Sequence, residues 1–245
     1  MKNALDDQRD SRFQSFAAAY EDVQARVRAS AAGQDAALSL LAVSKTQPAA
    51  AIRQLAHQGQ RAFGENYVQE ALGKQPDLAD LDLEWHLIGP LQSNKCRDVA
   101  EHFDWLQSLD RAKLIEPLAR YRPHDQAPLN VLIQVNIDDE SSKSGCAPTA
   151  VPDLADRVVA TPSLRLRGLM AIPAPAPDLV GRRDAFRRMR VLFDELRARH
   201  AGIDTLSMGM SDDFELAIGE GATMVRVGSL LFGRRAAHAT PNSPP

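Results

Sequence analysis

The sequence contains little cysteine. Cys96 and Cys146 are the two cysteines in 245 residues, and they form no CxxC pair. Disulfide frameworks and zinc modules carry denser cysteine patterns, so neither redox chemistry nor a metal site is predicted. A chain of this length buries a core that needs no covalent or metal support. We therefore expect a protein of the reducing cytoplasm.

Long hydrophobic runs and an excess of one charge are also missing. The N-terminal stretch MKNALDDQRDSRF has no apolar core like that of a signal peptide, and no segment approaches the length of a membrane-spanning helix. Lys and Arg number 29 against 32 Asp and Glu, a net charge of −3. This balance predicts no binding to nucleic acid or to a membrane. The residues leave monomer and dimer open, and we expect a monomer.

The sequence is rich instead in short apolar runs that alternate with helical patterns. Apolar residues at helical spacing predict an amphipathic helix over residues 11–32. The runs predicted as strands are Ser39–Ser44, Arg61–Phe63, Trp85–Ile88, Trp105–Ser108, Asn130–Ile137, Leu166–Ala171, Thr205–Met208 and Met224–Gly228. The clearest helices predicted between them are Pro48–Gln58, Arg111–Tyr121, Thr149–Ala160, Leu179–His200 and Asp212–Glu220.

This alternation predicts an α/β fold, a (β/α)8 TIM barrel with an extra N-terminal helix. The alternative is an open, doubly wound sheet, which usually has a Gly-rich turn after its first strand, where this chain has SKTQP. No linker or repeat divides the chain. We expect one barrel domain over residues 1–235 and a disordered tail, AAHATPNSPP, over residues 236–245.

Lys45 stands at the end of the first predicted strand, in LLAVSKTQP. In a barrel, functional residues gather at the carboxyl ends of the strands. Alternation along a strand puts Leu41, Val43 and Lys45 on one face, and if that face is the interior, the amine points into the mouth of a pocket. Partial burial favours the neutral amine, which attacks carbonyls. The alternative is a lysine that reaches into solvent.

Ser and Gly residues follow the last two predicted strands. Ser211 lies at the N-cap position of the helix predicted from Asp212, and Gly228 and Ser229 come after the eighth strand. Backbone N–H groups at such turns bind anions, and a hydroxyl adds a hydrogen bond. These residues predict a phosphate site, with an ordinary helix cap as the alternative for Ser211. Asp212 and Asp213 must then point away from the phosphate.

Arg226 lies in the middle of the eighth predicted strand, among apolar residues. A buried guanidinium is costly unless it is paired or hydrogen-bonded. It therefore either pairs with an interior carboxylate or meets a ligand. A ligand with a carbonyl for Lys45, a phosphate for the two turns and a group that contacts Arg226 is pyridoxal 5′-phosphate (PLP), whose ring nitrogen accepts from arginine.

Several longer motifs resemble one known family. They are AVSKTQP, FGENYVQEA, WHLIGPLQSNK, NVLIQVN, SKSG, LRGLMAIP, LSMGMSDDFE and VRVGSLLFG, in this order along nearly the whole chain. The chain thus resembles the pyridoxal-phosphate homeostasis proteins, which are single-domain relatives of the barrel domain of alanine racemase.

The resemblance implies that Lys45 carries PLP as a Schiff base, that Arg226 meets the pyridine nitrogen, and that Ser211, Gly228 and Ser229 hold the phosphate. It also implies that Asn66 lies near the ring. The function implied is PLP binding in intracellular vitamin B6 homeostasis, by buffering or by delivery to apo PLP-dependent enzymes. No turnover and no catalytic residue are expected.

The alternative function is a PLP-dependent amino-acid racemase. Racemisation needs a base on each face of the substrate carbon, and Lys45 supplies one. In alanine racemase the opposing tyrosine comes from an added C-terminal domain, which we expect this chain to lack. Tyr67 is the one of its three tyrosines predicted near a pocket loop. Homeostasis is therefore favoured.

Four further features of the sequence are weaker candidates for a functional role. The loop GPLQSNK, Gly89–Lys95, lines a pocket mouth or serves as a turn with Ser93 as a helix cap. His86 is predicted as a hydrogen-bonded core residue. Lys143, after the fifth strand, is a solvated lysine or a second amine for the aldehyde. The arginines of the helix 179–200 are most simply a solvated face.

Overall fold

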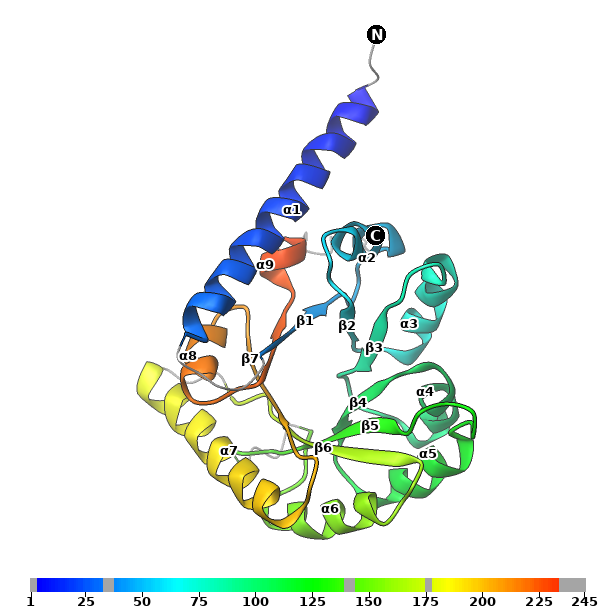
Figure 1. The fold of residues 1–245 in the computed structure, drawn as a ribbon, viewed down its shortest axis with the longest axis vertical. Coiled ribbons are helices and arrows are strands. Elements are labelled where there is room, and N and C mark those ends of the chain that lie inside the picture. Colours follow the sequence, from blue (N-terminus) through cyan, green and yellow to red (C-terminus); the bar gives the residue numbers. More distant parts are fainter. Residues whose placement is uncertain (1–3, 33–37, 139–143, 175–177, 234–245) are drawn as a thin grey trace, which may run out of the picture.

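The structure is a computed structural model that describes residues 4–32, 38–138, 144–174 and 178–233. The tail predicted over residues 236–245 lies outside these ranges. Eight parallel strands form a closed barrel in chain order, and β1 pairs with β8 to close it (Figure 1). The strands are β1 Ser39–Val43, β2 Ala62–Glu65, β3 Glu84–Leu87, β4 Trp105–Leu109, β5 Leu129–Gln134, β6 Leu164–Met170, β7 Thr205–Met210 and β8 Met224–Val227. The predicted (β/α)8 barrel is confirmed, and the open sheet is wrong.

Helices surround this barrel. The α-helices are α1 Ala4–Ser30, α2 Ala49–His57, α3 Val68–Lys74, α4 Cys96–His102, α5 Ile115–Tyr121, α6 Val151–Val159, α7 Leu179–Arg199, α8 Phe214–Gly219 and α9 Ser229–Phe232. Four 3-10 helices are also described: η1 Gln75–Leu78, η2 Ser93–Lys95, η3 Ala112–Leu114 and η4 Pro148–Ala150. The sequence did not predict the short helices α3 and α9, since each is too brief to repeat its apolar pattern. The helix expected after the loop GPLQSNK is present as α4.

The extra N-terminal helix is present, and it is longer than predicted. α1 begins at Ala4 rather than Ser11, and its N-terminal half extends past the barrel (Figure 1). Its C-terminal half packs on α2, α8 and α9, with Val23 and Val27 buried. The ring of Phe16 meets that of Phe232 in α9 edge to face, 6.1 Å between centroids. No helix in the described ranges is long and apolar enough to cross a membrane.

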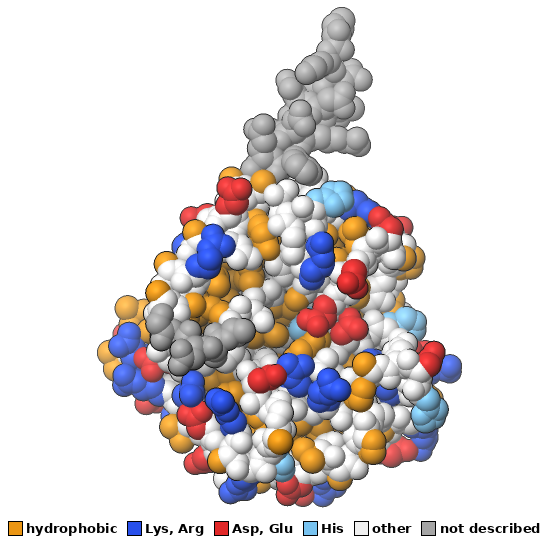
Figure 2. Space-filling view, in the orientation of Figure 1, with side chains coloured by type: hydrophobic (Ala, Val, Ile, Leu, Met, Phe, Trp, Pro, Cys, Tyr) orange, Lys and Arg blue, Asp and Glu red, His pale blue; other side chains and the backbone are white. Residues whose placement is uncertain are grey.

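The main apolar core lies between the strands and the surrounding helices. In α7 the buried side consists of Phe186, Met189, Phe193 and Leu196, together with Ala185. The arginines of α7 lie outside and mostly pair with carboxylates, as Arg183 and Arg187 do with Glu220. On the face seen in Figure 2, basic and acidic side chains are intermixed. The interpretation of the arginines as a solvated face is confirmed, and their pairing with carboxylates is an addition from the structure.

Candidate functional site

A cavity of about 510 Å³ lies at the carboxyl ends of the strands. This volume is within the usual range for small-molecule sites. Its lining includes all six residues predicted from the sequence: Lys45, Asn66, Ser211, Arg226, Gly228 and Ser229. Since these residues come from four different strand ends, the closed barrel is what brings them together.

Lys45 reaches the cavity from the end of β1. Leu41 packs inside the barrel on Ile88 and Met224, and Val43, two residues on, lines the cavity with Lys45. The predicted alternation is therefore confirmed, and the inward face of β1 carries the amine. Lys45 itself is neither fully buried nor exposed. Its stem is thus partly fixed by the cavity wall.

Arg226 forms part of the cavity floor, and only 3% of its surface is exposed. Its guanidinium donates to Ser207 Oγ and to the carbonyl of Ala171, each at 2.7 Å. Among the described residues no carboxylate pairs with it, so the interior ion pair left open by the sequence is not formed. Burial lowers the pKa of Arg226 to about 10, which keeps it charged at neutral pH. A buried cation without an anion favours an electron-rich ligand atom.

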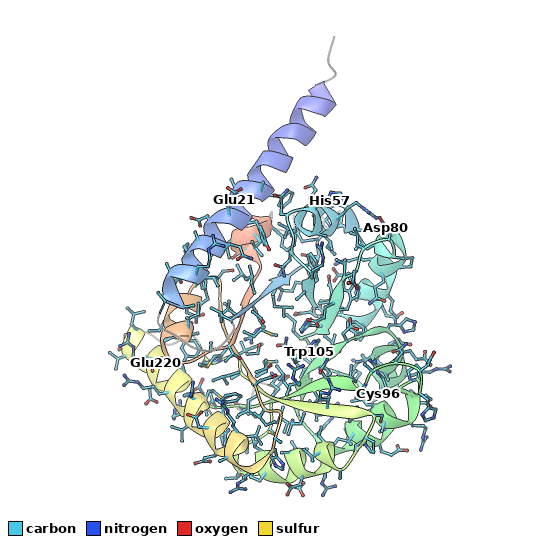
Figure 3. All side chains as sticks on the ribbon, in the orientation of Figure 1. Glu21, His57, Asp80, Cys96, Trp105 and Glu220 are labelled. Atoms are coloured by element: carbon cyan, nitrogen blue, oxygen red, sulfur yellow. The ribbon has the colours of Figure 1, made fainter. Side chains whose placement is uncertain are left out.

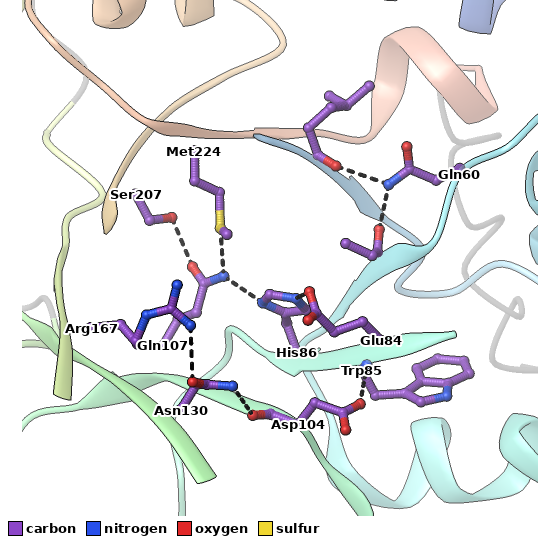
Figure 4. Close-up of polar contacts among 12 residues, drawn as sticks. Gln60, Glu84, Trp85, His86, Asp104, Gln107, Asn130, Arg167, Ser207 and Met224 are labelled. Carbon is purple, nitrogen blue, oxygen red and sulfur yellow. Dashed lines mark hydrogen bonds and ion pairs between the residues drawn. The ribbon is translucent and has the colours of Figure 1, made fainter. Parts of the chain in front are cut away.

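A chain of polar side chains runs through the barrel interior from Ser207, the residue that accepts from Arg226, to Glu84 (Figure 4). Ser207 Oγ donates to Gln107 Oε1 at 2.7 Å, and Gln107 Nε2 donates to His86 Nδ1 at 2.9 Å. His86 Nε2 lies 2.7 Å from a Glu84 carboxylate oxygen. Because Nδ1 accepts, the proton of the neutral imidazole lies on Nε2 and is donated to Glu84. The network fixes both the tautomer of His86 and the hydroxyl that holds Arg226.

His86 is fully buried, as the sequence predicted for a core histidine. Its ring stacks on Trp105 at 5.1 Å between centroids, and Figure 3 shows Trp105 near the middle of the barrel. Burial lowers the pKa of His86 below its ordinary value of 6.5, although Glu84 opposes this. The folded protein thus keeps this imidazole neutral.

We expect acid to destabilise the protein through His86. Below about pH 6.5 the unfolded chain binds a proton at His86 that the folded protein does not, so the free energy of unfolding falls as the pH falls, by up to about 1.4 kcal/mol per pH unit. Chemical denaturation between pH 7.5 and 5 measures this slope. His86→Gln should flatten it, whereas the exposed control His57→Gln should leave it unchanged. Equal slopes in all three proteins would contradict the assignment.

Ser211 joins the loops after β7 and β8, because its Oγ accepts from the N–H of Gly228 at 3.3 Å. The predicted cap role is wrong, since α8 begins at Phe214 rather than Asp212 and Asp213 occupies the N-cap position. The physical reason is a turn in which Asp213 Oδ1 accepts from the N–H of Met210 at 2.7 Å. This turn delays the helix and leaves Ser211 facing the cavity.

The two aspartates after Ser211 differ in their surroundings. Asp213 is buried and pairs with Arg182 of α7, so its charge is directed away from the cavity and is neutralised. Asp212 is exposed and lines the cavity. The sequence required both carboxylates to point away from a phosphate, and Asp213 meets this condition, whereas Asp212 lies in the cavity lining.

Asn66 and Gly89 form another part of the wall, at the ends of β2 and β3. A Cβ added to Gly89 would lie 2.1 Å from the backbone oxygen of Asn66, so only glycine permits this contact. Within GPLQSNK, Gly89 and Pro90 line the cavity, which favours the pocket-mouth interpretation for these two. Ser93 is the first residue of η2 and Gln92 takes the cap position, so the cap prediction for Ser93 is wrong.

Several cavity residues were not predicted from the sequence. They are Gln47, Ile88, Gln134, Ser144, Ile172 and Phe232. Most of them lie at or just beyond the carboxyl ends of strands, and this position in the sequence could have indicated that they line the cavity. Lys143, considered as a second amine, lies outside the described residues. Tyr67 is 63% exposed and is not among the described residues that line the cavity.

Comparisons with known proteins place this geometry in a family. A family model described as alanine racemase, N-terminal domain, matches residues 16–236. The pyridoxal phosphate homeostasis protein of Pseudomonas aeruginosa is 58% identical over 216 residues, 87% of this chain and 93% of that protein. The one from Escherichia coli K12 is 54% identical over 201 residues, 81% and 86% of the two chains. PipY from Synechococcus elongatus, solved with PLP bound, is 38% identical with a TM-score of 0.76, covering 89% and 100%.

Proposed function

Since this chain belongs to the pyridoxal phosphate homeostasis proteins, a family with the N-terminal domain of alanine racemase, we propose that it binds PLP and takes part in vitamin B6 homeostasis. In this proposal Lys45 holds PLP as a reversible Schiff base, and the protein buffers or delivers the cofactor. The observation that carries the proposal is the meeting of an amine, a buried guanidinium and a hydroxyl-lined turn in one cavity.

The residues present fit PLP at each of its polar ends. The Nζ of neutral Lys45 is suited to bond with the aldehyde carbon, with release of one water, and added water reverses the bond. Ser211, Gly228 and Ser229 are suited to the phosphate, and Arg226 to the ring nitrogen. The side chain of Asp213, already paired with Arg182, does not oppose the phosphate.

The arginine favours holding the cofactor over extensive chemistry on it. When bound, PLP supplies an electron sink whose strength depends on protonation of its ring nitrogen. Arg226 donates and does not give up its proton, so the ring nitrogen stays largely neutral. A neutral ring withdraws electrons less strongly than a protonated ring. The site is therefore better suited to retention of PLP than to transamination.

The cavity wall also disfavours the racemase alternative. A racemase needs a second base opposite Lys45. None of the three tyrosines is among the described lining residues, and the carboxylate among those residues is that of Asp212, beside the predicted phosphate turn. These positions support binding without turnover.

A transfer assay tests the function. The loaded protein is mixed with an apo PLP-dependent enzyme, with and without a trap for free PLP, and recovery of that enzyme's activity is followed. Buffering predicts recovery that the trap abolishes, and direct delivery predicts recovery that survives it. No recovery in either arm would contradict the proposed function. Incubation with L- or D-alanine should give no interconversion above background, whereas clear racemisation would favour the alternative.

A further inference from the structure

The backbone beside Lys45 has an unusual conformation. Thr46 has a φ of 65°, and it is the non-glycine residue with positive φ among the described residues. A β-branched residue is unfavourable in this left-handed region and stays there only when its surroundings hold it. Gln47 N donates to the carbonyl of Ser44 at 3.0 Å, which closes a turn around Lys45. Something in the fold must therefore hold this turn.

Three charged side chains next to the turn form what we call the Lys74 cluster: Glu65, Glu70 and Lys74. Lys74 Nζ lies 2.9 Å from Glu65 Oε1, 2.5 Å from Glu70 Oε1 and 3.0 Å from the carbonyl of Ser44. These three acceptors match the three N–H groups of an ammonium. Lys74 is only 8% exposed, and Glu65 is fully buried.

The cluster binds the residues on both sides of Lys45. Ser44 Oγ donates to Glu65 Oε1 at 2.6 Å, and Lys74 Nζ donates to the carbonyl of Ser44. On the other side, the N–H of Thr46 donates to Glu70 Oε1 at 2.5 Å. The backbone on both sides of Lys45 is thus held, at Ser44 by Lys74 itself and at Thr46 by Glu70, whose carboxylate is bonded to Lys74.

Glu65 combines full burial with an oxygen that has no hydrogen-bond partner among the described residues. That oxygen is Oε2, and burial raises the pKa of the Glu65 carboxyl, although Ser44 and Lys74 oppose this. A buried ion pair with an unsatisfied oxygen contributes little to stability compared with apolar packing. Such groups fit a role in fixing geometry. Asn66, the next residue, lines the cavity.

We propose that Glu65, Glu70 and Lys74 are positioning residues that hold the Ser44–Thr46 backbone so that the amine of Lys45 enters the cavity. This inference rests on the proposed function, because it assigns the cluster to the residue that bonds PLP. The cluster acts on Lys45 through the backbone of the turn, by its hydrogen bonds to Ser44 and Thr46.

Glu70 allows a test in a partly exposed position. Glu70→Ala removes the acceptor of the Thr46 N–H, whereas Glu70→Gln keeps an oxygen there and removes the charge. We expect Glu70→Ala to weaken PLP binding about three- to tenfold, measured by titration of the Schiff-base absorbance, and Glu70→Gln to change it less than twofold. Equal binding by wild type and Glu70→Ala would overturn the proposal.

Lys74→Met removes the centre of the cluster and should weaken PLP binding about tenfold. Its matched control is Arg122→Met, because Arg122 is a cation with 6% exposure that donates to the carbonyls of Ala100, Phe103 and Ala127, away from the cavity. The control should lose thermal stability but keep PLP affinity. If both variants lose PLP affinity equally, the effect is one of stability and the proposal fails.

Pyridoxine 5′-phosphate separates this proposal from the proposed function, since it has no aldehyde and cannot bond to Lys45. Lys74→Met should bind it as wild type does, because only the amine is misplaced. Equal losses for both ligands would show a collapsed cavity and would overturn the positioning role. If wild type binds PLP without Schiff-base absorbance, the proposed function fails instead.

Discussion

Lys45→Ala is expected to abolish the Schiff-base absorbance of the protein and to weaken PLP binding by about 100-fold or more. Tenfold in affinity corresponds to about 1.4 kcal/mol, so this loss is about 3 kcal/mol. The expectation follows from the position of Lys45, whose amine is the one provided by the described lining of the cavity. Without it, only the non-covalent contacts of the ring and phosphate remain.

Two measurements check this prediction. Absorbance titration gives the affinity, and borohydride reduction followed by peptide mapping gives the residue that carries the cofactor. Lys95→Ala is the control, because Lys95 lies after β3 near the cavity loop but contacts Asp98 and does not line the cavity. It should bind PLP as wild type does. Recovery of the reduced adduct on another residue alone would refute the assignment to Lys45.

Arg226→Leu should weaken PLP binding by about 10- to 100-fold while leaving the Schiff base able to form. A hydrogen bond to a charged group contributes about 1.5–3 kcal/mol, and the leucine removes the donor proposed for the ring nitrogen. Fluorescence or absorbance titration measures the affinity, and the spectrum reports the bond to Lys45. An unchanged affinity would exclude the ring contact.

Stability is the complication for Arg226, because its removal leaves the carbonyl of Ala171 without this donor. Arg167→Leu provides a control for the loss of a barrel arginine. Arg167 bonds Asn130 and Asp204, its guanidinium lies 4.7 Å from the centre of the Trp105 ring, and it does not line the cavity. Both variants should lose stability, but only Arg226→Leu should lose PLP affinity.

The sequence predicted most of the barrel and the two basic residues of the described cavity lining, Lys45 and Arg226. Alternation in β1 fixed the side to which Lys45 points, and a guanidinium in the apolar strand β8 required an interior partner or ligand. These inferences succeeded because each depends on residues two to five positions apart. The predicted start of α8 at Asp212 was wrong. The side chain of Asp213 accepts a hydrogen bond from the N–H of Met210, and this forms a turn where the first residues of the helix were expected.

Hydrogen bonds between residues far apart in the chain could not be predicted from the sequence, for a physical reason. Gln107 and Ser207 stand out as polar residues in apolar strands, yet they are 100 positions apart, and nothing local selects one as the partner of the other. The same holds for Lys74 and Ser44, 30 positions apart. A polar residue in an apolar strand indicates that its side chain is hydrogen-bonded to some partner. Which partner it bonds is determined by the packing of the closed barrel.

The pairing of β1 with β8 has a consequence for synthesis of the chain. It places Ser39 beside Met224, so the barrel closes only after nearly all of the chain has left the ribosome. Lys45 is made early, but Arg226 and the turns with Ser211, Gly228 and Ser229, which line the same cavity, come from the last two strands and the loops after them. Such distant pairings are late events in folding. A chain that lacks β7 and β8 therefore has the Lys45 amine but no closed cavity around it. We expect such a chain to retain the cofactor only after these two strands have joined the barrel.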